Sequence, residues 1–310
     1  MGKKLLLIGG TYFVGRVFSI MMSRAGHSLT FLNRGKYSMK PLGTVKEIVC
    51  DRRDADKLKK ISSGENSDTV YDAVIDFCAY EPGDIALLYE NLSFKWKQYI
   101  YFSTADVYAR TMVSKTEEAP LKTKKPEDEV ELYAYKKMCL EEELKKQSEK
   151  RGNSYTILRP AFIYGPYNYA PRESWFIRQI IQEGTAYRPV DADGAFQMVY
   201  VKDVANAVSL CMDSSEAQNT VYNLSAPEIM TYDRYLGLLR TVSDRAFQTM
   251  DIRVEEALEQ RIPLPFPLWK EESELFDGSK IVRELGLEYS RPEEAMRLTF
   301  DAFKGVYDRG

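Results

Sequence analysis

Hydrophobic residues fall in short runs that alternate with longer amphipathic segments through the first half of the chain. The short runs are nearly continuous and rich in leucine and β-branched residues, which is typical of strands buried on both faces of a parallel sheet. The longer segments have the apolar spacing of helices. We predict strands at Leu5–Ile8, Leu29–Leu32, Val45–Val49, Ala73–Phe77, Tyr99–Phe102 and Thr156–Leu158, and helices at Gly15–Ala25, Asp54–Ile61, Asp84–Leu92 and Tyr133–Lys150.

The alternation of strands and helices predicts an α/β fold with a Rossmann-like, doubly wound parallel sheet. After Pro160 the pattern changes, because Tyr164–Pro171 is rich in Gly, Pro and Tyr and is typical of a loop. The later predicted elements are a helix at Trp175–Glu183, a strand at Met198–Val201 and a helix from Asp203. We expect a dinucleotide-binding domain of residues 1–165 and about 195–213, and a smaller mixed lobe of about 166–194 and 214–310.

A glycine-rich loop follows the first predicted strand and opens the first predicted helix. In this context Gly9 permits a tight turn, Gly10 lets the backbone approach a pyrophosphate, and Gly15 permits close packing of the helix. The start of the helix adds amide donors and a positive potential. We therefore expect a dinucleotide to bind the loop, which consists of Gly9, Gly10, Thr11, Tyr12, Phe13, Val14 and Gly15.

The end of the second predicted strand indicates which dinucleotide binds. The acidic residue that would bind a ribose 2′-hydroxyl is replaced there by Asn33, and Arg34 follows. Asparagine removes a charge that would repel a 2′-phosphate, and the fork of an arginine suits phosphate. We therefore expect NADP ahead of NAD; Arg34 facing solvent or stacking on the adenine is the alternative.

Two further polar stretches have expected local roles. Asp51 ends the third predicted strand, where its carboxylate is placed to accept a hydrogen bond from the adenine amino group, to cap the following helix, or to do both. Glu141–Glu143, followed by Lys145 and Lys146, is expected to form a solvated helix face with i,i+4 ion pairs.

Three polar side chains stand in an order that suits hydride transfer at a carbinol carbon. Tyr133 and Lys137 are one helical turn apart on one face, and Thr104 follows the strand predicted at Tyr99–Phe102. A phenol can exchange the substrate proton, but its ordinary pKa of about 10 is too high for neutral pH, and a nearby ammonium favours the phenolate. The Thr104 hydroxyl can bind the oxygen that is oxidised or reduced. We expect these three residues to be catalytic.

Composition and charge exclude several classes of protein and site. The net charge of −3 gives no electrostatic reason to bind nucleic acid or an anionic membrane, and no apolar stretch is long enough to cross a bilayer. His27 is the only histidine, which excludes histidine metal clusters and Ser-His-Asp catalysis. The four cysteines are widely spaced (Cys50, Cys78, Cys139 and Cys211), so we expect reduced thiols and no disulfide framework. The N-terminus resembles no signal peptide. We expect a cytoplasmic protein without a metal.

Together these motifs resemble the extended short-chain dehydrogenase/reductase family, in its nucleotide-sugar epimerase/dehydratase group. The resemblance covers nearly the whole chain, and the loop glycines have the form found in an atypical branch of the family. It rests on six motifs in the family's order: Gly9–Gly15, Asp51–Arg52, Phe102–Tyr108, Tyr133–Lys137 with Glu141, Leu158–Pro166 and Val199–Ala205.

The resemblance implies roles for individual residues. Thr104 is similar to the active-site hydroxyl of the family, Tyr133 to its acid/base, and Lys137 to the residue that holds the nicotinamide ribose. Asp106 takes the position of the base in the family's dehydratases. A homodimer built on the Tyr133 helix is implied as well. The further dinucleotide contacts implied are Arg52, Phe77, Cys78, Ala79 and Pro160.

The function expected from this resemblance is an NAD(P)-dependent oxidoreductase or epimerase that acts on a sugar or nucleotide-sugar by Tyr-assisted hydride transfer. A 4,6-dehydratase is one alternative, although Ala105 stands where dehydratases carry the first of two acidic residues. The other is a dinucleotide-sensing or RNA-binding protein without catalysis. Two departures from the family favour this second alternative. Tyr12 replaces the middle glycine of the loop, and Phe196 replaces an arginine that binds the nucleoside diphosphate in many epimerases. We expect a small-molecule sugar as partner, and no nucleic acid or membrane.

Overall fold

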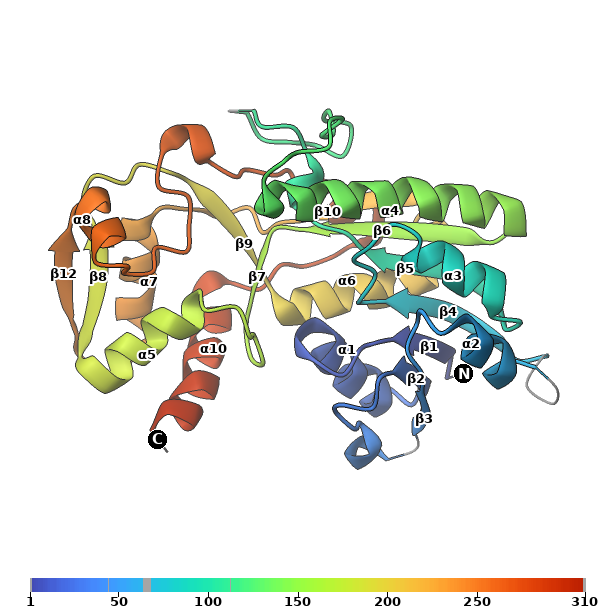
Figure 1. Cartoon of the computed structure of the whole chain (residues 1–310). Coiled ribbons are helices and arrows are strands. Elements are labelled where there is room, and N and C mark those ends of the chain that lie inside the picture. Colours follow the sequence, from blue (N-terminus) through green and yellow to red (C-terminus); the bar gives the residue numbers. More distant parts are fainter. Residues whose placement is uncertain (1, 44, 64–67, 112, 309–310) are drawn as a thin grey trace.

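The described part of the chain, residues 2–43, 45–63, 68–111 and 113–308, is built around a seven-stranded parallel sheet (Figure 1). This computed structural model confirms the predicted α/β class with a doubly wound sheet. The strand order is β10-β6-β5-β4-β1-β2-β3, so the order reverses between β1 and β4, where such folds bind ligands. The strands are β1 (Lys4–Ile8), β2 (Ser28–Asn33), β3 (Val45–Val49), β4 (Val70–Asp76), β5 (Lys95–Phe102), β6 (Ser154–Pro160) and β10 (Thr220–Leu224).

Two groups of helices cover the two faces of this sheet. On one face α1 packs against α6; on the other, α3 packs against α2 and α4. Alternate residues of β1 serve the two cores, because Leu5 and Leu7 belong to the α1 side and Leu6 and Ile8 to the α3 side. Burial on both faces explains the continuous apolar runs. The helices are α1 (Phe13–Arg24), α2 (Ala55–Ile61), α3 (Asp84–Asn91), α4 (Glu129–Arg151) and α6 (Val201–Asp213).

The later half of the chain forms a smaller mixed lobe beside the carboxyl ends of the large sheet (Figure 1). Its described strands make a three-stranded sheet, β11-β9-β7, and a two-stranded sheet, β12-β8. An aromatic stack fills its core, in which Phe196 lies 4.1 Å from Phe266 between ring centroids. The lobe contains β7 (Phe162–Tyr164), α5 (Glu173–Glu183), β8 (Thr185–Pro189), β9 (Phe196–Tyr200), β11 (Ile229–Met230), α7 (Tyr232–Val242), β12 (Gln248–Ile252), α8 (Val254–Glu259) and α10 (Pro292–Tyr307).

The expected boundary between the two parts needs correction. β10 was expected in the smaller lobe, but it pairs in parallel with β6 and extends the large sheet. Conversely, β7 and β9 were expected in the dinucleotide-binding domain, and they pair with each other in the lobe's sheet. α9 (Ser279–Leu285), also expected in the lobe, packs on β10 and α6. The chain therefore crosses between the two parts several times.

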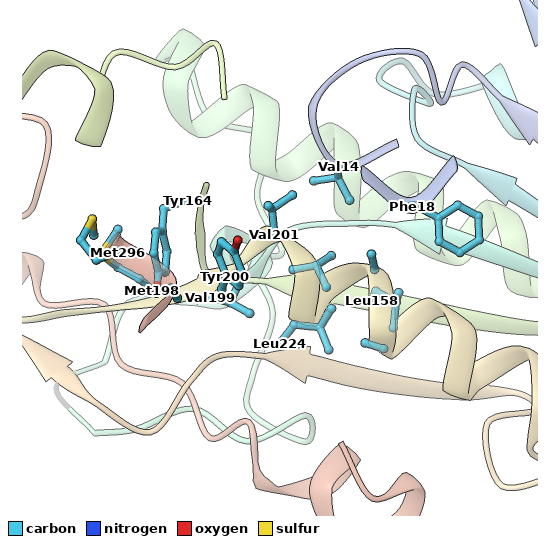
Figure 2. Close-up of a cluster of buried hydrophobic side chains, with 14 of the residues drawn as sticks. Val14, Phe18, Leu158, Tyr164, Met198, Val199, Tyr200, Val201, Leu224 and Met296 are labelled. Atoms are coloured by element: carbon cyan, nitrogen blue, oxygen red, sulfur yellow. The ribbon is translucent and has the colours of Figure 1, made fainter. Parts of the chain in front are cut away.

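One apolar cluster continues from the large sheet into the lobe. Val14 and Phe18 of α1 and Leu158 of β6 belong to the same cluster as Met198 of β9 and Met296 of α10 (Figure 2). The two parts therefore share a core. Within the described residues, no helix is long and apolar enough to cross a membrane.

Candidate functional site

The glycine loop lies at the carboxyl end of β1, against the turn that follows β4. Gly9 and Gly10 have positive φ angles of 80° and 74°, which side chains rarely allow. A Cβ on Gly9 would lie 3.0 Å from Cys78 Sγ. A Cβ on Gly15 would lie 2.4 Å from the Cα of Gly10, so α1 can start close to the turn only because this residue is glycine. The predicted tight turn and close packing are both present.

The other loop residues divide between the core and an aromatic contact. Val14, in the first turn of α1, is buried in the core, and Thr11 is half-buried. Tyr12 is 47% exposed, stacks on Tyr37 with 5.4 Å between ring centroids, and contacts Tyr169 at 5.3 Å. Phe13, which has a φ of 39°, meets Tyr169 edge-on. Tyr12 thus links the loop to the segment after β2 and to the loop after β7.

Asn33 and Arg34 lie where the sequence places them, at the carboxyl end of β2. Asn33 Oδ1 accepts a hydrogen bond of 2.6 Å from the Gly35 amide, while Asn33 Nδ2 is buried without a partner in the described residues. Arg34 is exposed, and within the described residues its guanidinium makes no hydrogen bond, ion pair or ring contact. Both side chains therefore keep donors that no described group of the protein uses.

Asp51 and Arg52 differ from expectation. The helix cap is Asp54, which accepts from the Lys57 amide at 2.9 Å, whereas Asp51 accepts from the Arg53 amide in the preceding turn. The capping role expected for Asp51 is therefore wrong.

The Arg52 guanidinium, expected beside the dinucleotide, is only 8% exposed and makes a bidentate pair with Asp76, at 2.9 and 2.8 Å. Tyr99 donates to the same carboxylate at 2.5 Å. Asp76 holds the pKa of Arg52 above its ordinary value although burial acts to lower it. This guanidinium fixes the ends of β3 and β4 and leaves no terminal nitrogen free for a ligand.

The turn after β4 packs against the glycine loop. Phe77 stacks on Phe102 at 4.8 Å and would touch a Cβ placed on Gly10. Burial raises the pKa of Cys78 to about 11, so the thiol stays neutral. Pro160 is buried at the end of β6, on the same edge of the sheet.

Thr104 and Tyr133 share Asp106 as a neighbour. Thr104 follows β5, and its hydroxyl donates to Asp106 Oδ2 at 2.9 Å, at the start of the 3₁₀ turn η3 (Ala105–Val107). Tyr133, in the first turns of α4, is 41% exposed. Burial around its phenol and then the charge of Asp106 raise the pKa of Tyr133 above its ordinary value. A pocket of about 260 Å³ is lined by Tyr133, Tyr80, Glu81, Glu129, Leu132 and Lys136.

Lys137 is held by the backbone. Its Nζ donates to the carbonyl of Phe102 at 2.5 Å and to that of Ala79 at 3.0 Å, and the residue is 2% exposed. Burial lowers the pKa of Lys137 to about 8. The charges that act on the Tyr133 phenol are those of Asp106, Tyr169 and Arg172, and the pKa rises. Lys137 is not among these charges; its ammonium joins the carbonyls of Ala79, after β4, and Phe102, at the end of β5.

The acidic run of α4 is a solvated face only at Glu142, which is exposed and pairs with Lys145 at i,i+3. Glu141 is fully buried and pairs with Arg159 of β6 at 2.6 and 3.0 Å, and it also accepts from Ser103 at 2.5 Å. Glu143 accepts from the amides of Gly83 and Ala86 at 2.7 and 2.6 Å, which caps α3. These contacts fix α4, and with it Tyr133 and Lys137, against the sheet.

A dinucleotide fits this edge of the sheet on the structure's own evidence. A side chain would fill the cradle at Gly9 and Gly10, and Asn33 offers a buried donor without a described partner. Both features suit a ligand with phosphate and ribose oxygens. No group of three or more His, Cys, Asp or Glu among the described residues could hold a metal ion.

Comparison with known proteins connects this geometry to one family. Residues 5–225 match the NAD dependent epimerase/dehydratase family. The chain belongs to this family. The match runs from β1 through β10 and includes the glycine loop, Thr104, Tyr133 and Lys137. The family consists of nicotinamide-dinucleotide-dependent epimerases and dehydratases, so the resemblance seen in the motifs is confirmed.

The chain is similar to a curated protein, the chloroplast stem-loop binding protein of 41 kDa b from Arabidopsis thaliana, with 32% identity over 248 residues. That match covers 74% of this chain and 61% of the plant protein, so the chain spans about three fifths of its relative.

Solved structures share the fold at lower identity. The UDP-glucose 4-epimerase of Thermotoga maritima with UDP-glucose has a TM-score of 0.75 and 19% identity, covering 98% of this chain and 99% of that one. The UDP-glucose-4-epimerase of Stenotrophomonas maltophila, with bound NAD and formylated UDP-arabinopyranose, has a TM-score of 0.77 and 15% identity, covering 99% and 100%.

Proposed function

We propose that this protein is an NAD(P)-dependent enzyme that oxidises and reduces a hydroxyl-bearing carbon of a nucleotide-sugar, as an epimerase or a reductase. One observation carries the proposal. Lys137 binds the carbonyls of Ala79, after β4, and Phe102, at the end of β5. Thr104 follows β5, and Asp106 neighbours both Thr104 and Tyr133. The turn after β4 also contacts the glycine cradle, through Cys78. This is the edge of a doubly wound sheet where a bound nicotinamide would lie.

In this proposal the side chains of the protein move the proton of the substrate hydroxyl and bind its oxygen. Tyr133 takes the proton of the substrate hydroxyl as general base, and Thr104 binds the same oxygen. A bound NAD(P)⁺ supplies the hydride acceptor, so that a C–OH becomes C=O as the dinucleotide is reduced. Tyr133 returns the proton when the carbonyl is reduced again. Hydride return to the opposite face gives epimerisation.

Two features support a nucleotide-sugar as substrate and NADP as the preferred dinucleotide. Relatives of the same fold were solved with UDP-glucose or with a UDP-arabinopyranose derivative. Asn33 places no negative charge at the end of β2, and the exposed Arg34 has a guanidinium that can pair with a 2′-phosphate.

The decisive experiment replaces Tyr133 by Phe, which removes only the hydroxyl. We expect turnover of UDP-glucose, UDP-glucuronic acid or a reduced or epimeric counterpart to fall by a factor of about 100 to 10,000, the usual range for a general acid–base group. The dissociation constant for NADP⁺ should stay within about twofold, since the ring is retained. A matched control is Tyr135→Phe on the same helix. Equal turnover in wild type and Tyr133→Phe would refute the proposed chemistry.

A second candidate function follows from the curated relative. Its name describes stem-loop binding, and its 32% identity is higher than that of the epimerase structures described above. The net charge of −3 opposes RNA binding by this chain. A filter-binding titration with a structured RNA at physiological salt distinguishes the two. Micromolar binding without hydride transfer to any sugar nucleotide would favour the second candidate.

A further inference from the structure

Lys115 has a buried side-chain stem and an ammonium without a described acceptor. The residue is 5% exposed, and its Nζ lies 4.8 Å from the centroid of the Phe276 ring. Among the described residues, neither a hydrogen bond nor an ion pair is made by this Nζ. The tip of the side chain is not enclosed, because Nζ is not among the buried polar atoms that lack a partner. Its three N–H donors are therefore open to an acceptor that a ligand brings.

The backbone of the smaller lobe brings a carboxylate to the same place. The Lys115 amide donates to the Leu275 carbonyl at 3.0 Å, and the Asp277 amide donates to the Lys115 carbonyl at 2.9 Å. Glu274 stands next to this pairing, anchored through its own amide to the Ala195 carbonyl at 2.9 Å. Side chains two residues apart on an extended segment point to one side, so Glu274 and Phe276 face the same way.

This segment packs directly on the 3₁₀ turn that carries Asp106. Phe276 is buried in one cluster with Ala105, Val107 and Tyr108, and its ring lies 6.1 Å from that of Tyr108. Because Asp106 lies within this turn, Lys115 and Glu274 are brought to the side of the site where Thr104 stands.

The charges of these groups act on one another, as the backbone pairing of the two segments leads us to expect. Burial and then Asp106 raise the pKa of Glu274 to about 7, while Lys115, Lys122 and Arg110 act to lower it. Burial lowers the pKa of Lys115, against the opposing effect of Glu274 and Asp106. An ammonium and a carboxylate therefore act on each other here without forming a described ion pair. The arrangement leaves a donor and an acceptor side by side.

We propose that Lys115 and Glu274 form a hydroxyl-binding pair that holds the sugar ring of the substrate beside Asp106. One sugar hydroxyl accepts from the Lys115 ammonium, and a neighbouring hydroxyl donates to the Glu274 carboxylate. The inference rests on the proposed function only in taking the ligand to be a sugar. Lys115 comes from the larger part of the molecule and Glu274 from the smaller lobe. The proposed sugar site therefore needs both parts.

The test measures sugar binding separately from catalysis. Protein saturated with NADP⁺ is titrated calorimetrically with UDP-glucose, UDP-glucuronic acid and free glucose. We expect Lys115→Met and Glu274→Met each to weaken binding of the best probe about tenfold or more, the effect of one hydrogen bond to a charged group. Lys124→Met and Glu271→Met, exposed positions on the same two segments, serve as matched controls and should leave binding unchanged.

The outcomes separate this inference from the proposed function. Unchanged affinity in both variants overturns the hydroxyl-binding pair even if the wild type turns over its substrate. Failure of the wild type to bind any of the three probes overturns it as well, because a pair of this chemistry should hold a hexose ring. Weakened binding in the variants would support the hydroxyl-binding pair. If the wild type at the same time transfers no hydride, the proposed hydride-transfer chemistry is refuted. Lys115→Gln, which retains a donor, should recover part of the affinity and guards against misfolding of Lys115→Met.

Discussion

The Thr104 hydroxyl donates a hydrogen bond to Asp106, with 2.9 Å between Oγ1 and Oδ2. A hydroxyl has one proton, so Thr104 can donate to a substrate oxygen only after this hydrogen bond to Asp106 opens. The Asp106 amide donates to the same oxygen at 3.2 Å, which fixes the side chain in one rotamer. Asp106 therefore sets the direction of the Thr104 proton, and its charge adds to the effect of burial on the pKa of Tyr133.

Replacement of Asp106 by Asn should shift the pH dependence of the reaction. The negative charge of Asp106 raises the pKa of Tyr133, so its removal lowers that pKa. Because the base must be deprotonated, the acidic limb of the kcat/KM profile should move to lower pH. Glu118→Gln removes an exposed carboxylate and should leave the profile in place.

The same variant tests the dehydratase alternative. Loss of turnover at every pH would assign Asp106 the role of the dehydratase base, whereas full turnover with a shifted profile excludes it. A limb that moves to higher pH would contradict the electrostatic argument.

Replacement of Gly15 by Ala should disrupt the dinucleotide loop. The new Cβ would lie 2.4 Å from the Cα of Gly10 and 2.8 Å from its carbonyl carbon, both rigid backbone atoms. Overpacking of this kind costs about 1–3 kcal/mol, so we expect a lower denaturation midpoint and at least tenfold weaker NADP⁺ binding.

Gly305→Ala is the matched control, because its Cβ in α10 would meet nothing within 4 Å. That substitution should stabilise the helix by about 0.5–1 kcal/mol. Equal NADP⁺ affinity in Gly15→Ala and wild type would show that the loop does not hold the dinucleotide.

Replacement of Arg34 by Ala should lower the affinity for NADP⁺ much more than the affinity for NAD⁺. If the guanidinium pairs with a 2′-phosphate, its loss should weaken NADP⁺ about 10- to 100-fold and NAD⁺ by less than about threefold. Isothermal titration with both dinucleotides measures the ratio. An equal effect on both would place Arg34 on the adenine or in solvent, and the preference for NADP would then be withdrawn.

Replacement of Glu141 by Gln should destabilise the whole fold. The buried Arg159 would lose its charge partner at the interface between α4 and β6, and a broken buried pair costs about 3–5 kcal/mol. Urea unfolding followed by circular dichroism measures the loss. Glu142→Gln, which breaks only a partly exposed pair with Lys145, should change stability by less than about 1 kcal/mol. A small change in Glu141→Gln would mean that the pair is not important for stability.

The sequence predicts the large sheet well because burial on both faces imposes continuous apolar runs. Five of its strands, β1, β2, β4, β5 and β6, are identified this way, and the edge strand β3 is predicted too although it is only partly buried. The pairing of β10 with β6 depends on a contact between residues about 60 positions apart, Thr220 with Thr156 for example, and no local pattern contains it. Short strands such as β11 have too few residues to show a period.

The candidate site is predictable where chemistry and spacing coincide, as for Thr104, Tyr133 and Lys137. The role of a charged residue in the site is not predictable where it depends on whether the folded chain buries that residue. Glu141 has the sequence pattern of a solvated residue, and only Arg159 on a different element makes its burial favourable. Lys115 and Glu274 give no sequence signal, because they are 159 positions apart and meet only through the lobe's backbone.

The cluster in Figure 2 limits how this protein can be shortened. A gene product ending at Asp213 would keep the glycine loop and the three polar residues, but β6 would become an outer strand with its hydrogen-bonding groups open to other chains. Leu158 would also lose its cross-strand neighbour Tyr222 of β10, which belongs to the same apolar cluster. The apparently self-sufficient front half should therefore aggregate when made alone.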